Sequence, residues 1–282
     1  MKLKEFLLEE KGGRVQHFTT DYEDGNYDEI VSYIKNDCSK ILDVYKNSHK
    51  FLWRGEASAK DRSPFEATIR TDRRPVEMNL QFHNEFNAAI ERNGLIAHRG
   101  NSIFCTTDID IAIGWGELCM IFPKNGFKYT WFTSHEHSHG HYVFDSINNA
   151  MDDIDEMTNR FKEAIVAGGG RKNVEGVLDK INTWKVGLIA RKLRKAVKNY
   201  GVEDSGKAMV SPDEFRNSLM DEFVSVELGA TSKGIEQFLK TDSEILIAGP
   251  GYYGVPLRPF MSGSWAGGWP SQHPVLKAIF DQ

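Results

Sequence analysis

Residues 244–257 read Glu-Ile-Leu-Ile-Ala-Gly-Pro-Gly-Tyr-Tyr-Gly-Val-Pro-Leu, and this stretch decides the class of fold. Its first four residues, 244–247, form a short apolar run that predicts a buried strand. The next glycines, in 249–254, match the letters GxGxxG of the dinucleotide-binding fingerprint. That fingerprint requires a helix directly after it, with its N-terminus facing a pyrophosphate. Because Pro256 and Pro259 follow and forbid a helix, we expect a turn between two strands instead of a Rossmann domain.

Outside this stretch, helical and strand patterns are mixed without the regular alternation of parallel βαβ proteins. The patterns predict strands at 51–54, 101–107 and 118–122, and helices at 80–92 and 152–167. A further helix is expected to begin at Ser211, because Ser211, Pro212 and Glu214 can form a capping box with proline in the first turn. Residues 1–50 are expected to be a helical, acidic segment. The pattern as a whole predicts an α+β protein.

Composition excludes several classes of protein. The chain has 282 residues, 40% of them hydrophobic and 27% charged, which is typical of a globular protein and excludes wholesale disorder. Its three cysteines form no paired framework, which favours a reducing compartment. The N-terminus has no secretory apolar core and no run approaches about 18 apolar residues. We therefore expect a soluble, cytoplasmic protein with no membrane partner.

The charge is unevenly distributed. Between Arg171 and Lys198 there are nine basic and two acidic side chains, a net charge of +7, which leaves −12 for the remainder of a chain whose total is −5. Apolar residues recur at helical spacing through this window, so the cations are expected to crowd one helix face. Such a face attracts the phosphates of nucleic acid, although an acidic protein or plain solvent would also suit it. The candidate nucleic-acid-binding residues are Arg191, Lys192, Arg194, Lys195 and Lys198.

Three other patterns are given non-catalytic interpretations. Four histidines alternate in 135–141, where a metal site is conceivable, but no HExxH spacing and no cysteine accompanies them, so we expect no metal cofactor. The glycines at 168–170 lack the spacing of a phosphate loop and are expected to end a helix. The cysteines have no neighbouring histidine arrangement, which disfavours a thiol nucleophile.

The most informative residues are spread over about 200 positions. In chain order they are Leu52-Trp53-Arg54-Gly55, Arg70-Thr71-Asp72-Arg73-Arg74-Pro75, Asn101-Ser102-Ile103-Phe104-Cys105-Thr106-Thr107, Gly114-Trp115-Gly116, Ile121-Phe122-Pro123, Asp242-Ser243-Glu244-Ile245-Leu246-Ile247 and Tyr252-Tyr253. Together they resemble the mono-ADP-ribosyltransferases of the arginine–serine–glutamate class, particularly divergent members of phages and bacteria. In that family an arginine ends the first core strand, an aromatic-x-Ser-Thr-Ser segment opens a second, and a glutamate lies where a loop enters a later strand. The resemblance covers roughly residues 50–255.

The resemblance implies a split antiparallel β core of the ADP-ribosyltransferase type. It divides the chain into the helical segment 1–50 and a catalytic domain 51–282, with a helical insertion at about 150–225. Its substrate is NAD+, held between the two half-sheets. The resemblance implies that Arg54, Thr107 and Glu244 are catalytic, with the arginine clamping the diphosphate and the glutamate stabilising the positive charge at the ribose. The cofactor-binding residues are Arg54, Gly55, Phe104, Thr106, Thr107 and Trp115.

Two departures from the family bear on the acceptor. Thr106 and Thr107 replace serines and keep the hydroxyls, whereas Asp242 stands where arginine-modifying members have glutamate. The basic window favours nucleic acid as the acceptor, with RNA or single-stranded DNA ahead of duplex because the modified base must be accessible. A protein acceptor and a non-enzymatic nucleic-acid-binding module remain alternatives. Since family members include toxins, phage takeover enzymes and antiphage effectors, the resemblance also implies an antitoxin or chaperone as a possible partner.

Overall fold

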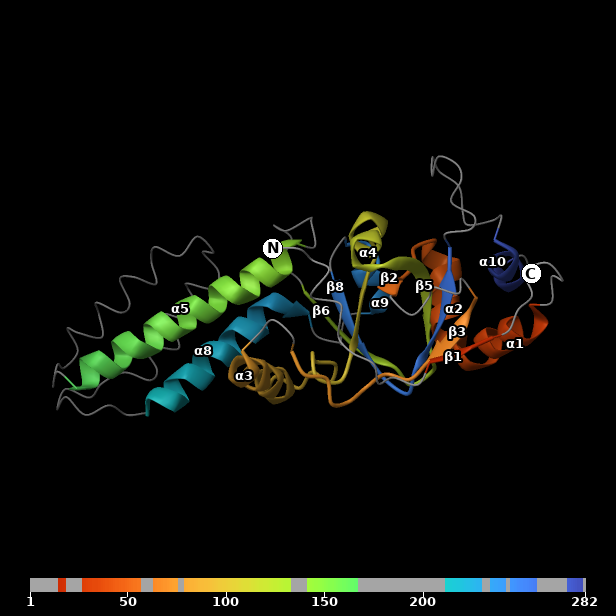
Figure 1. The fold of residues 1–282 in the computed structure, drawn as a ribbon. Coiled ribbons are helices and arrows are strands. Elements are labelled where there is room, and N and C mark those ends of the chain that lie inside the picture. The colour runs from red at the N-terminus through yellow and green to blue at the C-terminus, as the bar shows by residue number, and fades with distance from the viewer. Residues whose placement is uncertain are drawn as a thin grey trace. The chain divides into compact units, whose positions relative to one another are not determined.

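A computed structural model of the chain describes residues 15–18, 27–56, 63–75, 79–132, 141–166, 211–229, 234–241, 244–257 and 273–280. The chain divides into two compact units, which are described separately (Figure 1). The first comprises Met1–Asn79, Leu95–Gly140 and Ala230–Gln282, and the second comprises Leu80–Gly94 and His141–Gly229. The protein is of the mixed α+β class, as the sequence predicts.

The first unit is built on an antiparallel sheet of eight strands in the order β1-β3-β9-β5-β2-β4-β8-β6. The strands are β1 (Val15–His17), β2 (Trp53–Glu56), β3 (Phe65–Ala67), β4 (Ile103–Thr106), β5 (Glu117–Pro123), β6 (Lys128–Phe132), β8 (Glu244–Ala248) and β9 (Tyr252–Pro256). β2 joins β4 through a single residue pair, Trp53 with Thr106. The sheet is therefore thinly connected at this point, between a five-strand part and the three strands β4, β8 and β6.

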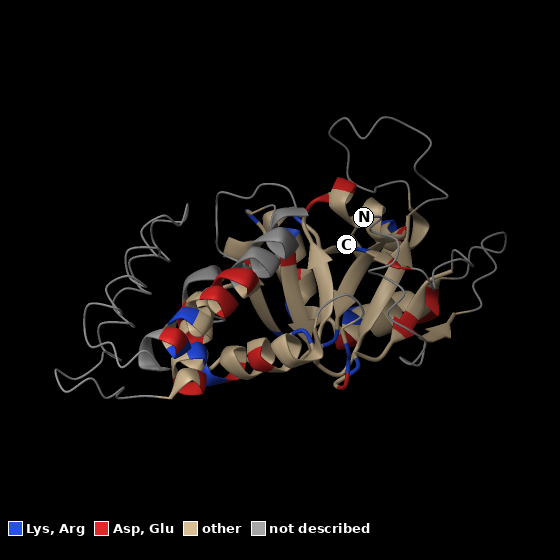
Figure 2. Ribbon diagram, turned by 60° about the vertical axis from the view of Figure 1, so that its left-hand side comes forward, with Lys and Arg blue, Asp and Glu red and all other residues tan. Residues whose placement is uncertain are grey.

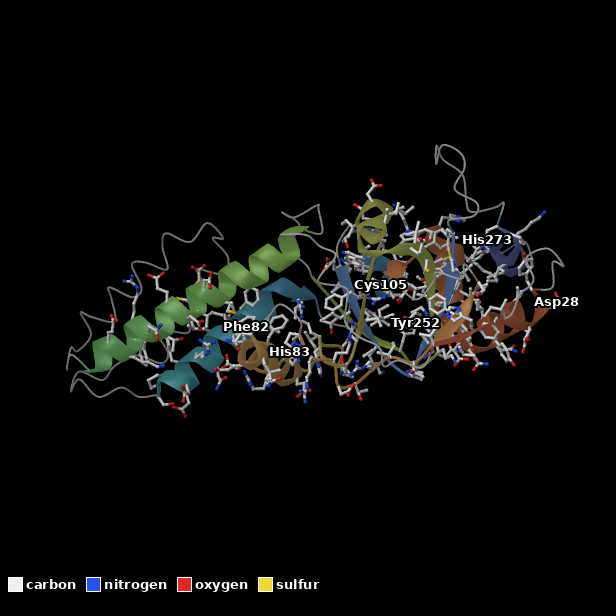
Figure 3. All side chains as sticks on the ribbon, in the orientation of Figure 1. Asp28, Phe82, His83, Cys105, Tyr252 and His273 are labelled. Carbon is white, nitrogen blue, oxygen red and sulfur yellow. The ribbon has the colours of Figure 1, made fainter. Side chains whose placement is uncertain are left out.

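Among the described residues, five helices belong to the same unit: α1 (Asp28–Asp37), α2 (Ser39–Ser48), α4 (Ile109–Trp115), α9 (Ile235–Phe238) and α10 (Pro274–Phe280). α1 and α2 bury one face each, including Ile34 and Ile41, in the core that also contains the sheet residues Cys105 and Tyr252. Figure 3 shows Cys105 and Tyr252 within the sheet and His273 at the start of α10. None of the described helices is long and apolar enough to cross a lipid bilayer.

The second unit contains α3 (Leu80–Arg92), α5 (His141–Val166) and α8 (Pro212–Glu227), followed by the short strand β7 (Leu228–Gly229). Both α3 and α5 pack against α8. Phe161 stacks on Phe215 with ring centroids 4.2 Å apart, and Arg216 pairs with Glu85 at 2.7 Å and with Asp155. Acidic side chains recur along the described part of α5 (Figure 2).

Several expectations can be compared directly with these elements. The turn after residue 248 is confirmed, since β8 ends at Ala248 and β9 begins at Tyr252. The capping box is also confirmed, because the Glu214 backbone N–H donates to Ser211 Oγ at 3.2 Å and the Ser211 N–H donates to Glu214 Oε2 at 2.7 Å.

Two expectations need correction. Residues 15–17, expected to be helical, pair with β3 as the strand β1. α5 begins at His141, eleven residues before the start that the apolar spacing predicted. The basic window 171–198 and the glycines at 168–170 lie outside the described residues, as do histidines 135, 137 and 139.

Candidate active site

The three strands that carry the arginine, the aromatic-x-Thr-Thr segment and the glutamate are neighbours in the sheet. Arg54 lies on β2, Phe104 and Thr106 lie on β4, and Glu244 is the first residue of β8. Thr106 pairs with Trp53 on one side and with Glu244 on the other, so these three residues form one row across three strands. Trp53 and Thr106, which precede Glu244 by 138 or more positions in the sequence, thereby lie in the same row of the sheet as Glu244.

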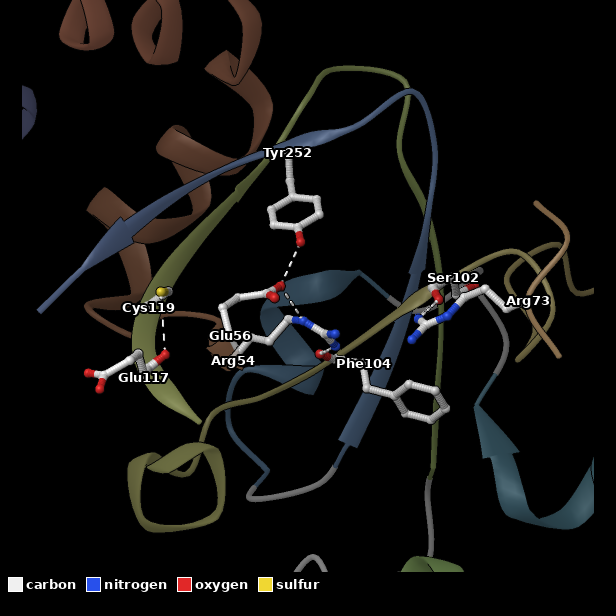
Figure 4. Close-up of polar contacts among 8 residues, drawn as sticks. All are labelled: Arg54, Glu56, Arg73, Ser102, Phe104, Glu117, Cys119 and Tyr252. Atoms are coloured by element: carbon white, nitrogen blue, oxygen red, sulfur yellow. Dashed lines mark hydrogen bonds and ion pairs between the residues drawn. The ribbon is translucent and has the colours of Figure 1, made fainter. Parts of the chain in front are cut away.

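Arg54 is engaged in a buried polar cluster with Glu56 and Tyr252 (Figure 4). Its Nε donates to Glu56 Oε1 at 2.5 Å, and a terminal nitrogen donates to the carbonyl oxygen of Phe104 at 2.8 Å. The hydroxyl of Tyr252 donates to the same Glu56 oxygen at 2.6 Å. Burial lowers the pKa of Arg54, but Glu56, Tyr252 and Cys105 together outweigh it and the net shift is upward. The positive charge of Arg54 is therefore compensated within the protein.

Glu244 lies in a different environment. The residue is 1% exposed, and its Oε2 has no hydrogen-bond partner among the described residues. Burial raises the pKa of Glu244 from 4.5 to about 8, and the nearby Arg99 opposes part of that rise. A buried carboxyl group with an unused oxygen can accept a hydrogen bond from a ligand hydroxyl or stabilise positive charge on a ligand.

Two arginines surround the ring of Phe104. The guanidinium carbon of Arg99 lies 5.2 Å from the ring centroid, and that of Arg73 lies 6.0 Å from it. Arg73 also donates from its side chain to the Ser102 carbonyl and from its backbone N–H to the Gly100 carbonyl at 2.9 Å. Figure 4 shows Arg73, Ser102 and the Phe104 ring together, away from the Arg54–Glu56–Tyr252 cluster.

The two threonines stabilise the ends of the site. Thr106 is fully buried, and its Oγ1 accepts a hydrogen bond from the Asp108 backbone N–H at 3.1 Å. Thr107 Oγ1 donates to the carbonyl of Thr241, three residues before Glu244. Asp108 then caps α4 by accepting from the N–H groups of Asp110 and Ile111. Thr107 therefore connects the end of β4 to the segment that leads into β8.

Gly55 and Trp115 lie where α4 passes over β2. A Cβ atom at Gly55 would lie 2.3 Å from the backbone nitrogen of Gly116 and 2.4 Å from the carbonyl oxygen of Ala112. The close approach of two backbones explains this glycine without any ligand. Trp115 is the last residue of α4 and is half-buried.

The structure does not bring every expected site residue together. Because neighbouring residues of a strand point to opposite faces, Arg54 points away from the face that Trp53, Thr106 and Glu244 share. Two of the Arg54 guanidinium nitrogens are engaged by Glu56 and by the Phe104 carbonyl, and the contact of Arg54 with a diphosphate stays a prediction. Arg191, Lys192, Arg194, Lys195, Lys198 and Asp242 lie outside the described residues.

Metal and thiol chemistry find no support in the described ranges. No group of three or more His, Cys, Asp or Glu side chains there could hold a metal ion. Cys38, Cys105 and Cys119 are free and buried, and burial raises the pKa of Cys105 to about 12, which suppresses the nucleophilic thiolate.

Four residues of the polar clusters around Arg54 and Phe104 were given no role by the sequence analysis. Arg99 and Glu56 carry no local motif, and Tyr252 bonds to Glu56 across 196 positions. Arg73 belongs to the basic stretch 70–75, whose charge was the one available signal.

Comparisons with known proteins supply no family. No protein-family model matches the chain, and searches of curated proteins and of solved structures also gave no match. The geometry of the site and the motif resemblance are therefore what point to a function.

Proposed function

We propose that the protein is an NAD+-dependent ADP-ribosyltransferase whose catalytic carboxylate is Glu244. The observation that supports this most strongly is the adjacency of β2, β4 and β8, with Thr106 paired to both Trp53 and Glu244. These strands carry, in the expected order, the arginine, the aromatic-x-Thr-Thr segment and the glutamate that resemble the transferase family. A chance similarity of scattered motifs would not require their strands to be consecutive neighbours.

The chemistry of the reaction suits the isolated carboxyl group. Cleavage of the bond between ribose C1′ and nicotinamide leaves the electron pair on nicotinamide and develops positive charge at C1′. Glu244 in its carboxylate form stabilises that charge, and its unused Oε2 accepts a hydrogen bond from a ribose hydroxyl. A nucleophile of the acceptor then forms the new bond to C1′ and releases its proton. The binding of a cationic ribosyl nicotinamide favours ionisation of Glu244, since opposite charge lowers a carboxyl pKa.

The acceptor is proposed from charge. The +7 window between Arg171 and Lys198 supports a nucleic-acid acceptor, because phosphate contacts by lysine and arginine release condensed counterions. RNA or single-stranded DNA fits best, since its bases need no extraction from a duplex.

The test of the enzyme is nicotinamide release from NAD+ by the full chain, with added RNA, with single-stranded DNA and with a protein extract. We expect release by the wild type and its loss in Glu244→Gln. Glu236→Gln is the matched control, because Glu236 is an exposed carboxylate of the same unit. Equal release by Glu244→Gln and wild type, or no release by the wild type with any acceptor, would contradict the proposal.

The acceptor is identified by label from adenine-labelled NAD+. Label that survives protease and disappears with nuclease supports a nucleic-acid acceptor. Label with the opposite sensitivity shows that the acceptor is a protein. The double variant Arg191→Glu/Arg194→Glu is expected to reduce nucleic-acid labelling, because it removes phosphate contacts. The salt dependence of the remaining labelling should be no steeper than that of the wild type.

A further inference from the structure

We propose that Thr130 is a positioning residue for Glu244, because its hydroxyl and Glu244 Oε2 hold one buried water molecule between them. The water accepts a hydrogen bond from Thr130 Oγ1 and donates one to the carboxylate. The catalytic role of that carboxylate rests on the proposed function, whereas the shared water does not. Thr130 belongs to none of the motifs that carry the family resemblance.

Two buried oxygen atoms in the described part of the chain lack hydrogen-bond partners. Glu244 is 1% exposed and Thr130 is fully buried, and neither Glu244 Oε2 nor Thr130 Oγ1 bonds to any described residue. A buried polar atom without a partner costs free energy, so such atoms are rare in native proteins. Buried water molecules typically bond to polar groups of this kind. One water shared by the two atoms removes both costs.

The sheet brings the two side chains to one face. β6 and β8 lie side by side, and their ladder pairs Thr130 with Leu246 (Figure 1). Glu244 is two residues from Leu246 on β8, so Thr130 and Glu244 share a face and are diagonal neighbours. Diagonal residues lie about 7–8 Å apart. A water with hydrogen bonds of about 2.8 Å spans up to about 5.6 Å between two oxygens, so the side chains need to cover only the remainder.

The other threonine hydroxyls of the site already have partners. Thr106 Oγ1 accepts from the Asp108 backbone N–H, and Thr107 Oγ1 donates to the Thr241 carbonyl. Thr130 is therefore the one of these three threonines whose hydroxyl is available to a water. Valine would occupy the same buried strand position without any need for a partner, since its side chain carries no polar atom.

The charges around Glu244 indicate what such a water does. Burial raises the pKa of Glu244 to about 8, and Arg99, the charged group that acts on it among the described residues, offsets only part of that rise. Arg73 in turn acts on Arg99. The neighbouring strands β4 and β6 contribute Thr106 and Thr130 to this face, and neither side chain titrates. Because a hydrogen bond to a carboxylate favours its charged form, the water increases the ionised fraction that the proposed chemistry requires.

The test follows the ionisation of Glu244 in the full chain without any substrate. The infrared band of its protonated carboxyl group, identified as the band that is absent from Glu244→Gln, is titrated from pH 5 to 10. We expect Thr130→Val to raise the pKa of Glu244 by about 1, because the carboxylate loses the hydrogen bond of the water. Thr130→Ser keeps the hydroxyl and should titrate like the wild type.

Thr158→Val is the matched control. Thr158 is also a buried threonine, but its Oγ1 donates to the Ile154 carbonyl in the second unit, so its replacement should leave the infrared titration unchanged. Thr130→Ala removes the same hydroxyl and takes the place of Thr130→Val where the valine variant does not fold. A Thr130→Val protein that titrates like the wild type and melts at a higher temperature would show a hydroxyl with no partner at all, which would overturn the inference.

The outcomes separate this inference from the proposed function. A raised Glu244 pKa in Thr130→Val that Thr130→Ser restores, in a protein that releases no nicotinamide, would support the shared water and contradict the enzyme. In a chain that does release nicotinamide, the acidic limb of the pH profile of kcat should move to higher pH in Thr130→Val while KM for NAD+ changes little. Nicotinamide release with the same pH profile and the same infrared titration in wild type and Thr130→Val would support the enzyme and overturn the inference.

Discussion

Thr106 and Glu244 lie directly opposite each other across the β4–β8 ladder, so the carboxyl group is held by two strands at the point where β8 begins. A residue at a strand start is fixed on one side by the ladder and depends on the preceding loop on the other. Thr107 supplies the second constraint through its bond to Thr241. The position of Glu244 is therefore set by the same Thr-Thr pair that the family resemblance predicts for an NAD+ site.

Replacement of Glu244 by glutamine should change the pH dependence of stability. Since the pKa of Glu244 rises from 4.5 in the unfolded chain to about 8 in the fold, the folded state binds more protons between these values. The wild type should therefore lose stability relative to Glu244→Gln as pH rises from about 5 to 8, by a few kcal/mol in all, at about 1.4 kcal/mol per pKa unit. Melting temperatures of both proteins from pH 5 to 9 measure this, and parallel curves would contradict it.

The Arg54–Glu56 pair should behave as an internal ion pair. Arg54→Leu leaves the Glu56 carboxylate buried beside Tyr252, which typically costs about 3–5 kcal/mol. Arg54→Leu/Glu56→Leu removes both charges and should recover much of that loss. Urea denaturation of the single and double variants measures the difference, with Tyr252→Phe as a control that removes one hydrogen bond, worth about 1 kcal/mol. A double variant less stable than the single would show that Arg54 has a different partner.

Local signals explain which parts of this structure could be predicted. The capping box at Ser211 and Glu214 and the turn after Ala248 depend on residues within a few positions of each other. Apolar spacing likewise predicted α3, β5 and β8 closely. The strand β1 could not be found in this way, because its three residues become a strand only by pairing with β3, about 50 positions away.

The partners of the site residues could not be predicted from the sequence for the same reason. The sequence patterns correctly predicted strands at Arg54 and at Glu244, but the position of a strand does not say which face of the sheet a side chain takes. That face follows from the register of Trp53 with Thr106, a single pair between distant segments. Arg99 bears no motif and gains its place beside Glu244 and Phe104 only when the turn 98–102 folds.

Gly55 should tolerate no side chain. A Cβ atom there meets backbone atoms of α4 at 2.3–2.5 Å, so Gly55→Ala must push the helix away from β2. Overpacking of this kind typically costs about 1–3 kcal/mol, and backbone atoms yield less than side chains. Gly114→Ala, at an exposed position of the same helix, is the control and should stabilise by up to about 1 kcal/mol. Thermal unfolding decides, and equal melting temperatures for Gly55→Ala and wild type would contradict the close approach.

The cysteines should be inert in the folded protein. Burial raises the pKa of Cys38, Cys105 and Cys119, so neither access nor thiolate formation favours alkylation. Iodoacetamide at pH 8 should label none of the three in the native state within the time that labels all three in denaturant, as counted by mass spectrometry. Rapid native labelling of any of them would show that its surroundings open readily.

Thr107 should position Glu244 without touching the ligand. Thr107→Val keeps the volume of the side chain but removes the hydroxyl that donates to the Thr241 carbonyl, which frees the segment leading into β8. If Glu244 is the catalytic carboxylate, its displacement should lower kcat for nicotinamide release about tenfold or more while the affinity for ADP-ribose changes little. Thr107→Ser restores the donor and should restore kcat, which a purely structural loss would not do. A Thr107→Val protein with wild-type kcat, or one that loses ADP-ribose affinity and turnover together, would show that this hydroxyl has another role.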